Sequence, residues 1–203
     1  MASWLADVLL YHIDERLTKL NGYYVRYSDD MILFGENEDV CRERAAEIRA
    51  SLVGYGLTMN PDKECFSSPD QGFIFLGFSI VGKRVDIAPA TLKKLKGKMR
   101  RKRDGLARWH KRNGVEPRKA AAAFIRIFNR KLLESSEGND LSWSSWFFSV
   151  INTTESLHLI DQYAQDCIRY LLSGSHRKSR FEVSYEDLKA LGYRSLVHEY
   201  YKK

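Results

Sequence analysis

The stretch Tyr23-Tyr-Val-Arg-Tyr-Ser-Asp-Asp-Met-Ile-Leu-Phe34 places two adjacent carboxylates, Asp29 and Asp30, between two short apolar runs. The flanking residues favour strands, so the pattern predicts a β-hairpin with the acids at its tip. Adjacent like charges repel each other, and a fold that presents them together usually holds a cation there. Carboxylate oxygens are hard ligands that suit Mg²⁺ or Mn²⁺. The alternative is an Asx-type turn in which Ser28 and Asp29 bond to the local backbone.

The positive charge of the chain is concentrated in one segment. The 203 residues carry a formal net charge of +7. Residues 93–112 hold 11 Lys or Arg and one acid, Asp104, whereas the rest of the chain holds 22 basic and 25 acidic side chains. A patch of this density indicates binding to phosphate backbones. A solvated helix face or an anionic membrane surface remains the alternative on charge alone.

Cysteine usage and hydropathy exclude several classes of protein. Cys41, Cys65 and Cys167 are isolated, so neither a zinc site nor a disulfide framework is indicated. Reduced thiols of this kind predict a cytoplasmic protein. No apolar run approaches the roughly 20 residues that span a bilayer, and the first residues lack the basic region of a signal peptide. We therefore expect no membrane partner.

The character of the chain changes near residue 88. Before it, periodicity predicts a helix over 3–20, the hairpin, a helix over 38–54 and short strands over 57–60, 73–80 and 85–87. After Pro89 the pattern is helical throughout. The expected helices are 90–112, 117–134, 143–150, 155–173, 184–191 and 194–201. The aromatic spacing within 141–151 is typical of a packed core more than of a base-stacking platform.

The order of these motifs resembles the reverse transcriptases, especially the bacterial group II intron-like lineage. Tyr27–Asp30 resembles the catalytic Tyr-x-Asp-Asp motif of that family. Leu57–Lys63 resembles the next palm motif, Leu-x-x-Asn-x-x-Lys, and Phe75-Leu-Gly-Phe78 resembles the primer grip. The resemblance implies an α+β fold. Residues 1–88 would be the C-terminal part of a polymerase palm, with helices on a small antiparallel sheet, and residues 89–203 an all-α thumb with a C-terminal extension.

The resemblance also implies roles for individual residues. Asp29 would be the principal metal ligand and Asp30 the supporting one in a two-metal site for Mg²⁺ or Mn²⁺. Lys63 would approach the nucleotide phosphates as a clamp or proton donor; the alternative is an exposed lysine that pairs with Asp62 or Glu64. The residues expected to contact the primer or nucleotide are Tyr27, Ser28, Phe75, Leu76 and Gly77.

The basic segment corresponds to the first helix of the implied thumb. Leu92, Leu95, Met99 and Leu106 occupy one face at helical spacing, and basic residues occupy the remainder. The thumb of this family grips the template–primer duplex. We therefore expect phosphate contacts from three basic side chains, Lys96, Arg100 and Arg103.

The implied activity is RNA-directed DNA synthesis, which is nucleotidyl transfer to a primer 3′-hydroxyl. Its partners are an RNA template, a DNA primer and dNTPs. The family has a further metal-binding Asp on a strand upstream of the helix at 3–20, so the third carboxylate is missing from this chain. We expect the chain to be a truncated piece that is inactive alone, and the surface exposed by truncation could pair two copies as a homodimer. The alternative is a reverse-transcriptase-derived, maturase-like RNA-binding module without polymerase activity.

Overall fold

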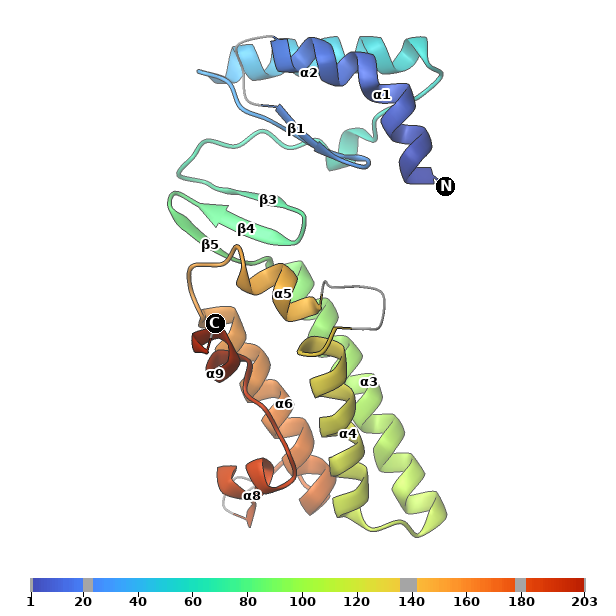
Figure 1. Ribbon diagram of the computed structural model, residues 1–203, viewed down its shortest axis with the longest axis vertical. Coiled ribbons are helices and arrows are strands. Elements are labelled where there is room, and N and C mark those ends of the chain that lie inside the picture. Colours follow the sequence, from blue (N-terminus) through green and yellow to red (C-terminus); the bar gives the residue numbers. More distant parts are fainter. Residues whose placement is uncertain (1, 20–23, 136–141, 178–181, 203) are drawn as a thin grey trace. The chain divides into compact units, whose positions relative to one another are not determined.

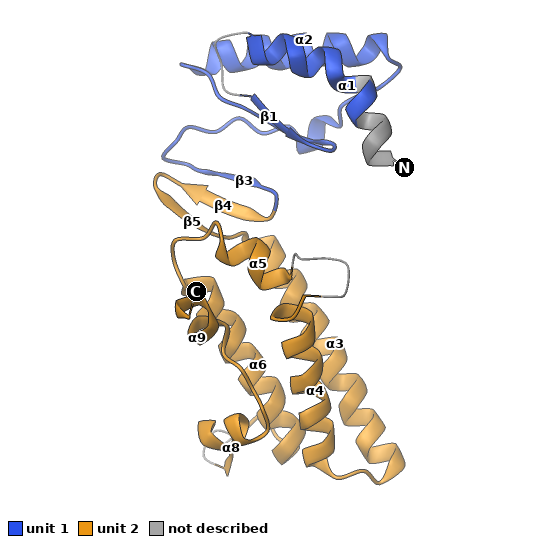
Figure 2. Cartoon of the chain, in the orientation of Figure 1, with its two compact units in different colours: residues 1–76 blue, residues 77–203 orange. Residues whose placement is uncertain are grey.

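A computed structural model describes residues 2–19, 24–135, 142–177 and 182–202. The chain forms two compact units, residues 1–76 and residues 77–203 (Figure 2). The first unit combines helices with short strands, and the second is a hairpin followed by helices, which confirms the predicted α+β class. The units divide after residue 76, whereas the sequence becomes helical near residue 88. The two positions differ because the hairpin formed by residues 78–87 belongs to the second unit. The assignment of the units as palm and thumb stays a prediction.

The first unit places two helices on one face of a β-hairpin (Figure 1). Its elements are α1 (Ala2–Lys19), β1 (Tyr24–Tyr27), β2 (Asp30–Leu33), α2 (Glu38–Gly54), the short 3₁₀ helix η1 (Pro61–Lys63) and β3 (Phe73–Phe75). Helix α2 begins where the side chain of Asn37 accepts a hydrogen bond from the Val40 amide at 3.0 Å. Such a cap satisfies one of the free amides of the first turn.

The core of the first unit forms between the helices and the inner face of the hairpin. Its buried side chains come from α1 and α2: Leu10, Ile13, Leu17, Ile48 and Leu52. Tyr24, Met31 and Leu33 of the hairpin pack against this cluster. Because strand side chains alternate between faces, Val25 and Tyr27 lie on the opposite face, where they are 52% and 57% exposed. The hairpin therefore has one buried face and one open face.

The second unit begins with the antiparallel hairpin β4–β5, and helices follow (Figure 1). Its elements are β4 (Phe78–Val81), β5 (Arg84–Ile87), α3 (Pro89–Asn113), α4 (Pro117–Leu132), α5 (Trp143–Phe148), α6 (Glu155–Ser173), α8 (Tyr185–Ala190) and α9 (Leu196–Tyr201). Helices α3, α4 and α6 pack against one another as a bundle. Prolines at the first turns of α3 and α4 suit positions whose amides lack a partner in the helix.

Aromatic packing and polar contacts fix the β4–β5 hairpin to the helices of the second unit. The ring of Phe78 lies 5.1 Å from that of Phe147 on α5. The side chain of Asn152 accepts from the Val85 amide at 2.9 Å and donates to the Lys83 carbonyl at 2.7 Å. Phe147 and Phe148 are buried, as the predicted core role of this segment requires, whereas Val150 is 48% exposed.

A buried carboxylate on α6 fixes the C-terminal segment. Asp161 accepts hydrogen bonds from the hydroxyls of Tyr193 and Ser195, at 2.7 and 2.6 Å. It also accepts from the amides of Leu196 and Val197 at 2.9 and 3.0 Å. Four donors compensate for the loss of hydration of a charged group, and together they hold the first turn of α9 against α6.

Two expectations about strands were wrong. The segment 57–60 has no regular secondary structure; Asn60 instead caps η1 by accepting from the Asp62 amide at 3.0 Å. The run 73–80 is interrupted by a turn at Leu76 and Gly77, with φ angles of 49° and 85°. Two positive φ angles end an extended strand, whereas apolar composition alone gave no sign of the break. Within the described ranges, no helix is long and apolar enough to cross a bilayer.

Candidate catalytic hairpin and nucleic-acid interface

The Tyr-x-Asp-Asp sequence forms the tip of the β1–β2 hairpin, as predicted from its flanks. The strands pair antiparallel with Tyr27 opposite Asp30, and Ser28 and Asp29 form the two-residue connection. Asp29 and Asp30 are both exposed. The side chains of Ser28 and Asp29 make no hydrogen bond to any residue that the structure describes. The structure therefore gives no support to the alternative of an Asx-type turn.

The turn is strained at Ser28. Its φ is 57°, in the left-handed region where a non-glycine residue costs roughly 1–2 kcal/mol. Ser28 and Leu76 are the non-glycine residues with positive φ in the described part of the chain, and both belong to motifs that the sequence singled out. Strain of this kind persists only where surrounding contacts maintain it.

Those contacts come from Arg26, whose side chain is 8% exposed. Its Nη1 donates to the backbone carbonyl of Ser28 at 2.9 Å. Its Nε and Nη2 donate to the two carboxylate oxygens of Asp14 on α1, at 2.9 and 2.5 Å. The Nη1 also donates to Asp7 on α1 at 3.0 Å, and the Tyr24 hydroxyl donates to Asp14 at 2.8 Å. One guanidinium thus connects the turn to the helix behind it.

The same contacts set the ionisation of the groups involved. Burial alone would raise the pKa of Asp14, but the hydrogen bonds from Arg26 and Tyr24 outweigh it and hold that pKa below its usual value. Burial and the bond to Asp14 raise the pKa of Tyr24. The hydrogen bond to Asp14 raises the pKa of Arg26. The network is therefore ionised as a carboxylate–guanidinium pair at neutral pH.

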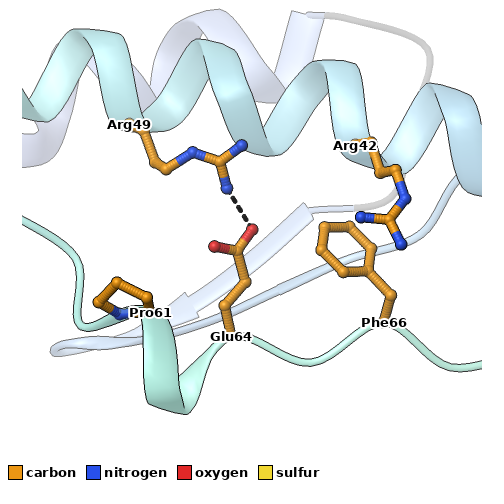
Figure 3. Close-up of a pocket in the computed structure, with 5 residues that line it drawn as sticks. All are labelled: Arg42, Arg49, Pro61, Glu64 and Phe66. Carbon is orange, nitrogen blue, oxygen red and sulfur yellow. Dashed lines mark hydrogen bonds and ion pairs between the residues drawn. The ribbon is translucent and has the colours of Figure 1, made fainter.

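Lys63 ends η1, and its side chain is exposed. It pairs with neither Asp62 nor Glu64 in the described chain. Glu64 instead forms an ion pair with Arg49 on α2. Figure 3 shows the side chains around this pair. They line a hollow of 390 Å³, in which the Arg42 guanidinium lies 4.4 Å from the centre of the Phe66 ring. These contacts attach the segment that follows Lys63 to α2 and leave the Lys63 ammonium exposed.

The predicted primer-grip residues form a tight turn. Phe75 ends β3 and is partly buried, while Leu76 and Gly77 adopt the positive φ angles given above. A β-carbon at Gly77 would lie 3.3 Å from the hydroxyl oxygen of Thr91 on α3, and the Gly77 carbonyl accepts from the Ala88 amide at 2.8 Å. Conformation and space therefore both favour glycine at this position.

The carboxylates at the hairpin tip fit part of a divalent-metal site. Mg²⁺ is commonly held by one or two carboxylates together with water and substrate phosphates, and Asp29 and Asp30 offer two such groups at one exposed turn. Among the described residues, no group of three or more His, Cys, Asp or Glu side chains lies close enough to hold a metal ion. The pair is thus compatible with a hard cation as a partial ligand set.

The three basic residues predicted to hold phosphates occupy different positions on α3. Arg103 bonds to Asp104 and lies 4.9 Å from the Tyr170 ring centre on α6, and its side chain is 14% exposed. Lys96 lies 5.7 Å from the Tyr163 ring centre, also on α6. Both side chains therefore face the bundle, whereas Arg100 is exposed.

A broader set of cations covers the outer face of α3. Nine of its Lys and Arg residues are exposed: Lys93, Lys94, Lys98, Arg100, Arg101, Lys102, Arg108, Lys111 and Arg112. None of the nine forms an ion pair with a residue in the described ranges. Because the one acid of this segment, Asp104, is engaged by Arg103, the outer face keeps its full positive charge.

Comparison with known proteins gives one finding on the first unit. Residues 1–80 match the model of the family described as Reverse transcriptase (RNA-dependent DNA polymerase). The matched segment contains the Tyr27–Asp30 hairpin, Lys63 and the turn at Leu76 and Gly77, and it ends before α3. The match supports the predicted reverse-transcriptase resemblance of this part. No curated protein matches the chain significantly.

Sequence reasoning did not identify Arg26 and Asp14 as part of the site. The sequence patterns assign no role to either residue. A signal was present, because alternation along β1 places Arg26 on the same face as Tyr24, the face that packs on the core. A charged residue on a buried strand face requires a partner of opposite charge.

Proposed function

We propose that the chain is the C-terminal palm and thumb portion of an RNA-directed DNA polymerase of the group II intron-like lineage. In the intact enzyme, a primer 3′-hydroxyl attacks the α-phosphate of a nucleotide on an RNA template. The observation that supports this most is the exposed Asp29–Asp30 tip on a hairpin inside the segment that matches the reverse transcriptase family.

In this proposal the residues of the first unit bind and orient the reactants. Asp29 is the principal metal ligand and Asp30 the supporting one. Tyr27, which is 57% exposed on the open hairpin face, contacts the primer terminus or the nucleotide. Lys63 approaches the nucleotide phosphates, and the turn formed by Leu76 and Gly77 after Phe75 contacts the primer.

The bound metal pair would lower the pKa of the primer hydroxyl and stabilise the departing pyrophosphate. Polymerase centres of the implied kind use three carboxylates, and Asp29 and Asp30 supply two. We therefore propose that this chain alone does not catalyse synthesis and that a third carboxylate must come from outside the described residues.

Primer extension on an RNA template, with dNTPs and Mg²⁺ or Mn²⁺, tests the catalytic proposal. It should be run together with direct measurement of Mn²⁺ binding by the wild type and by Asp29→Ala. We expect Mn²⁺ binding that Asp29→Ala removes, and no extension. Asp29-dependent synthesis by this chain would support the polymerase and overturn the need for a third carboxylate. Absence of both synthesis and Asp29-dependent binding would count against the proposed site.

A maturase-like RNA-binding role is the second candidate, and the cations of α3 are shared by both candidates. Nine exposed Lys and Arg residues on one helix provide a phosphate-binding surface that does not depend on the Asp pair. A binding competition between an RNA–DNA hybrid and a structured RNA of equal length distinguishes the polymerase role from the maturase-like role. Preference for the hybrid supports template–primer binding, and preference for the folded RNA supports the maturase-like role.

Two properties of the whole protein also belong to this proposal. The three cysteines are free, with Cys65 exposed, which agrees with a reducing, cytoplasmic environment. A homodimer through a surface exposed by truncation is the other expectation. Sedimentation of the wild type at increasing concentration tests the dimer.

A further inference from the structure

We infer that Arg26 is a positioning residue, which holds the turn carrying Asp29 in the conformation that presents both carboxylates to a cation. The inference rests on the proposed function for its metal-binding consequence. Its structural half, that Arg26 maintains the turn, rests on contacts within the first unit alone.

The first step concerns geometry. The turn at Ser28 is in a left-handed conformation that is strained for a non-glycine residue. The Ser28 carbonyl accepts a hydrogen bond from Arg26 Nη1 at 2.9 Å. A hydrogen bond from a charged donor is stronger than one between neutral groups, so this contact opposes the strain. Arg26 therefore stabilises the particular backbone conformation from which Asp29 and Asp30 project.

The second step concerns what holds Arg26 itself. Asp14 bonds to its Nε and Nη2, and Asp7 bonds to its Nη1. The two acids are seven residues apart on α1 and so lie on the same side of that helix. A guanidinium held in a two-pronged pair has a fixed plane and direction. Helix α1 thus holds the Arg26 guanidinium in place, and the guanidinium holds the turn at Ser28.

The third step concerns charge. An arginine three residues before a pair of metal-binding carboxylates would oppose a cation if its charge were free. The carboxylates of Asp7 and Asp14 give the trio a formal charge of −1, so Arg26 supplies its hydrogen bonds without a net positive field. Replacing Asp14 by asparagine would change the formal charge of the trio from −1 to 0 as well as loosen the geometry.

The experiment uses the full chain and two independent measurements. Backbone amide and ¹³C resonances of Ser28, Asp29 and Asp30 report the turn conformation without metal. Titration with Tb³⁺, a hard-cation probe excited through nearby tyrosine, reports cation affinity from the midpoint of the curve. Asp29→Ala defines which part of the Tb³⁺ signal belongs to the hairpin tip.

The informative variants are Arg26→Gln and Arg26→Lys, the latter keeping the charge and losing the planar fork. Arg49→Gln is the matched control, because Arg49 also forms an ion pair in the first unit, with Glu64 of another segment. We expect both Arg26 variants to shift the turn resonances and to weaken the Asp29-dependent Tb³⁺ affinity about tenfold, as loss of a supporting contact typically does. Arg49→Gln should do neither.

Unchanged Ser28 and Asp29 resonances in a folded Arg26→Gln would overturn the inference. If that variant does not fold, Arg26→Lys decides, because it keeps the charge and loses the planar fork; unchanged turn resonances there would also overturn the inference. A wild-type Tb³⁺ signal that does not depend on Asp29 would refute the metal site of the proposed function. The resonance measurement would still decide whether Arg26 holds the turn.

Discussion

Replacing Gly97 and Gly105 by alanine should raise the free energy of unfolding of the second unit. Both glycines lie inside α3, where glycine is about 0.8–1.0 kcal/mol less favourable than alanine. A β-carbon at Gly97 would meet nothing nearer than the flexible end of Arg101 at 3.7 Å, and one at Gly105 would meet nothing within 4 Å. No steric cost therefore opposes the gain.

The magnitude for the double variant follows from the spacing of the two sites. Eight residues separate them along the helix, about 12 Å, so the two effects should add to about 1.6–2 kcal/mol. For a unit of this size the midpoint of thermal unfolding should rise by about 6–8 °C. Tryptophan fluorescence follows this unit well, because Trp109, Trp143 and Trp146 lie within it.

Gly114→Ala is the matched control, since it makes the same chemical change at the end of the same helix. Gly114 has φ of 60° and its amide bonds back to the His110 carbonyl, so alanine should destabilise by about 1 kcal/mol. No gain from the Gly97 and Gly105 pair would refute the argument that the outer face of α3 is open at these points. Because neither change alters charge, the salt dependence of nucleic-acid binding should stay the same.

Other predictions follow from contacts described above. Gly77→Ala should destabilise the second unit by about 1–2 kcal/mol, because alanine is strained at φ of 85° and its β-carbon would press on Thr91, and denaturant unfolding measures it. The low folded pKa of Asp14 means that its stabilisation is full above the unfolded pKa of about 3.9 and is lost as the pH falls through the folded value. Asp14→Asn should therefore lower stability at pH 7 and flatten its fall in acid, and urea unfolding at several pH values that shows the wild-type slope would contradict this. Arg100→Glu should reduce the salt slope of hybrid binding by at least about one unit, whereas Arg103→Gln should mainly lower thermal stability, because Arg103 faces Asp104 and Tyr170. Equal effects of the two changes on the salt slope would refute the distinction between outward and inward cations.

The sequence was most informative where a local pattern determines structure by itself. The hairpin at Tyr27–Asp30 followed from strand formers on both sides of two acids, and its register places the acids at the tip as expected. The long helices followed from periodicity and from their end signals, such as Pro89 and Gly114. Each of these features depends on residues close together in the chain.

Features that depend on tertiary contacts could not be predicted in the same way. Helical spacing placed Lys96 and Arg103 among the basic residues outside the apolar stripe, but only the packing of α6 shows that they face Tyr163 and Tyr170. The partner of Arg26 lies 12 residues away on another element, and nothing local identifies it. The missing strand at 57–60 has a similar cause, because a strand requires a neighbour to pair with.

The exposed cations of α3 also set a length scale. They extend over 20 positions, from Lys93 to Arg112, which is about 30 Å of helix. A duplex lying along this helix would be contacted over about that length. Affinity for short duplexes should therefore increase with each added base pair up to about that length, and beyond it only through the greater number of binding registers.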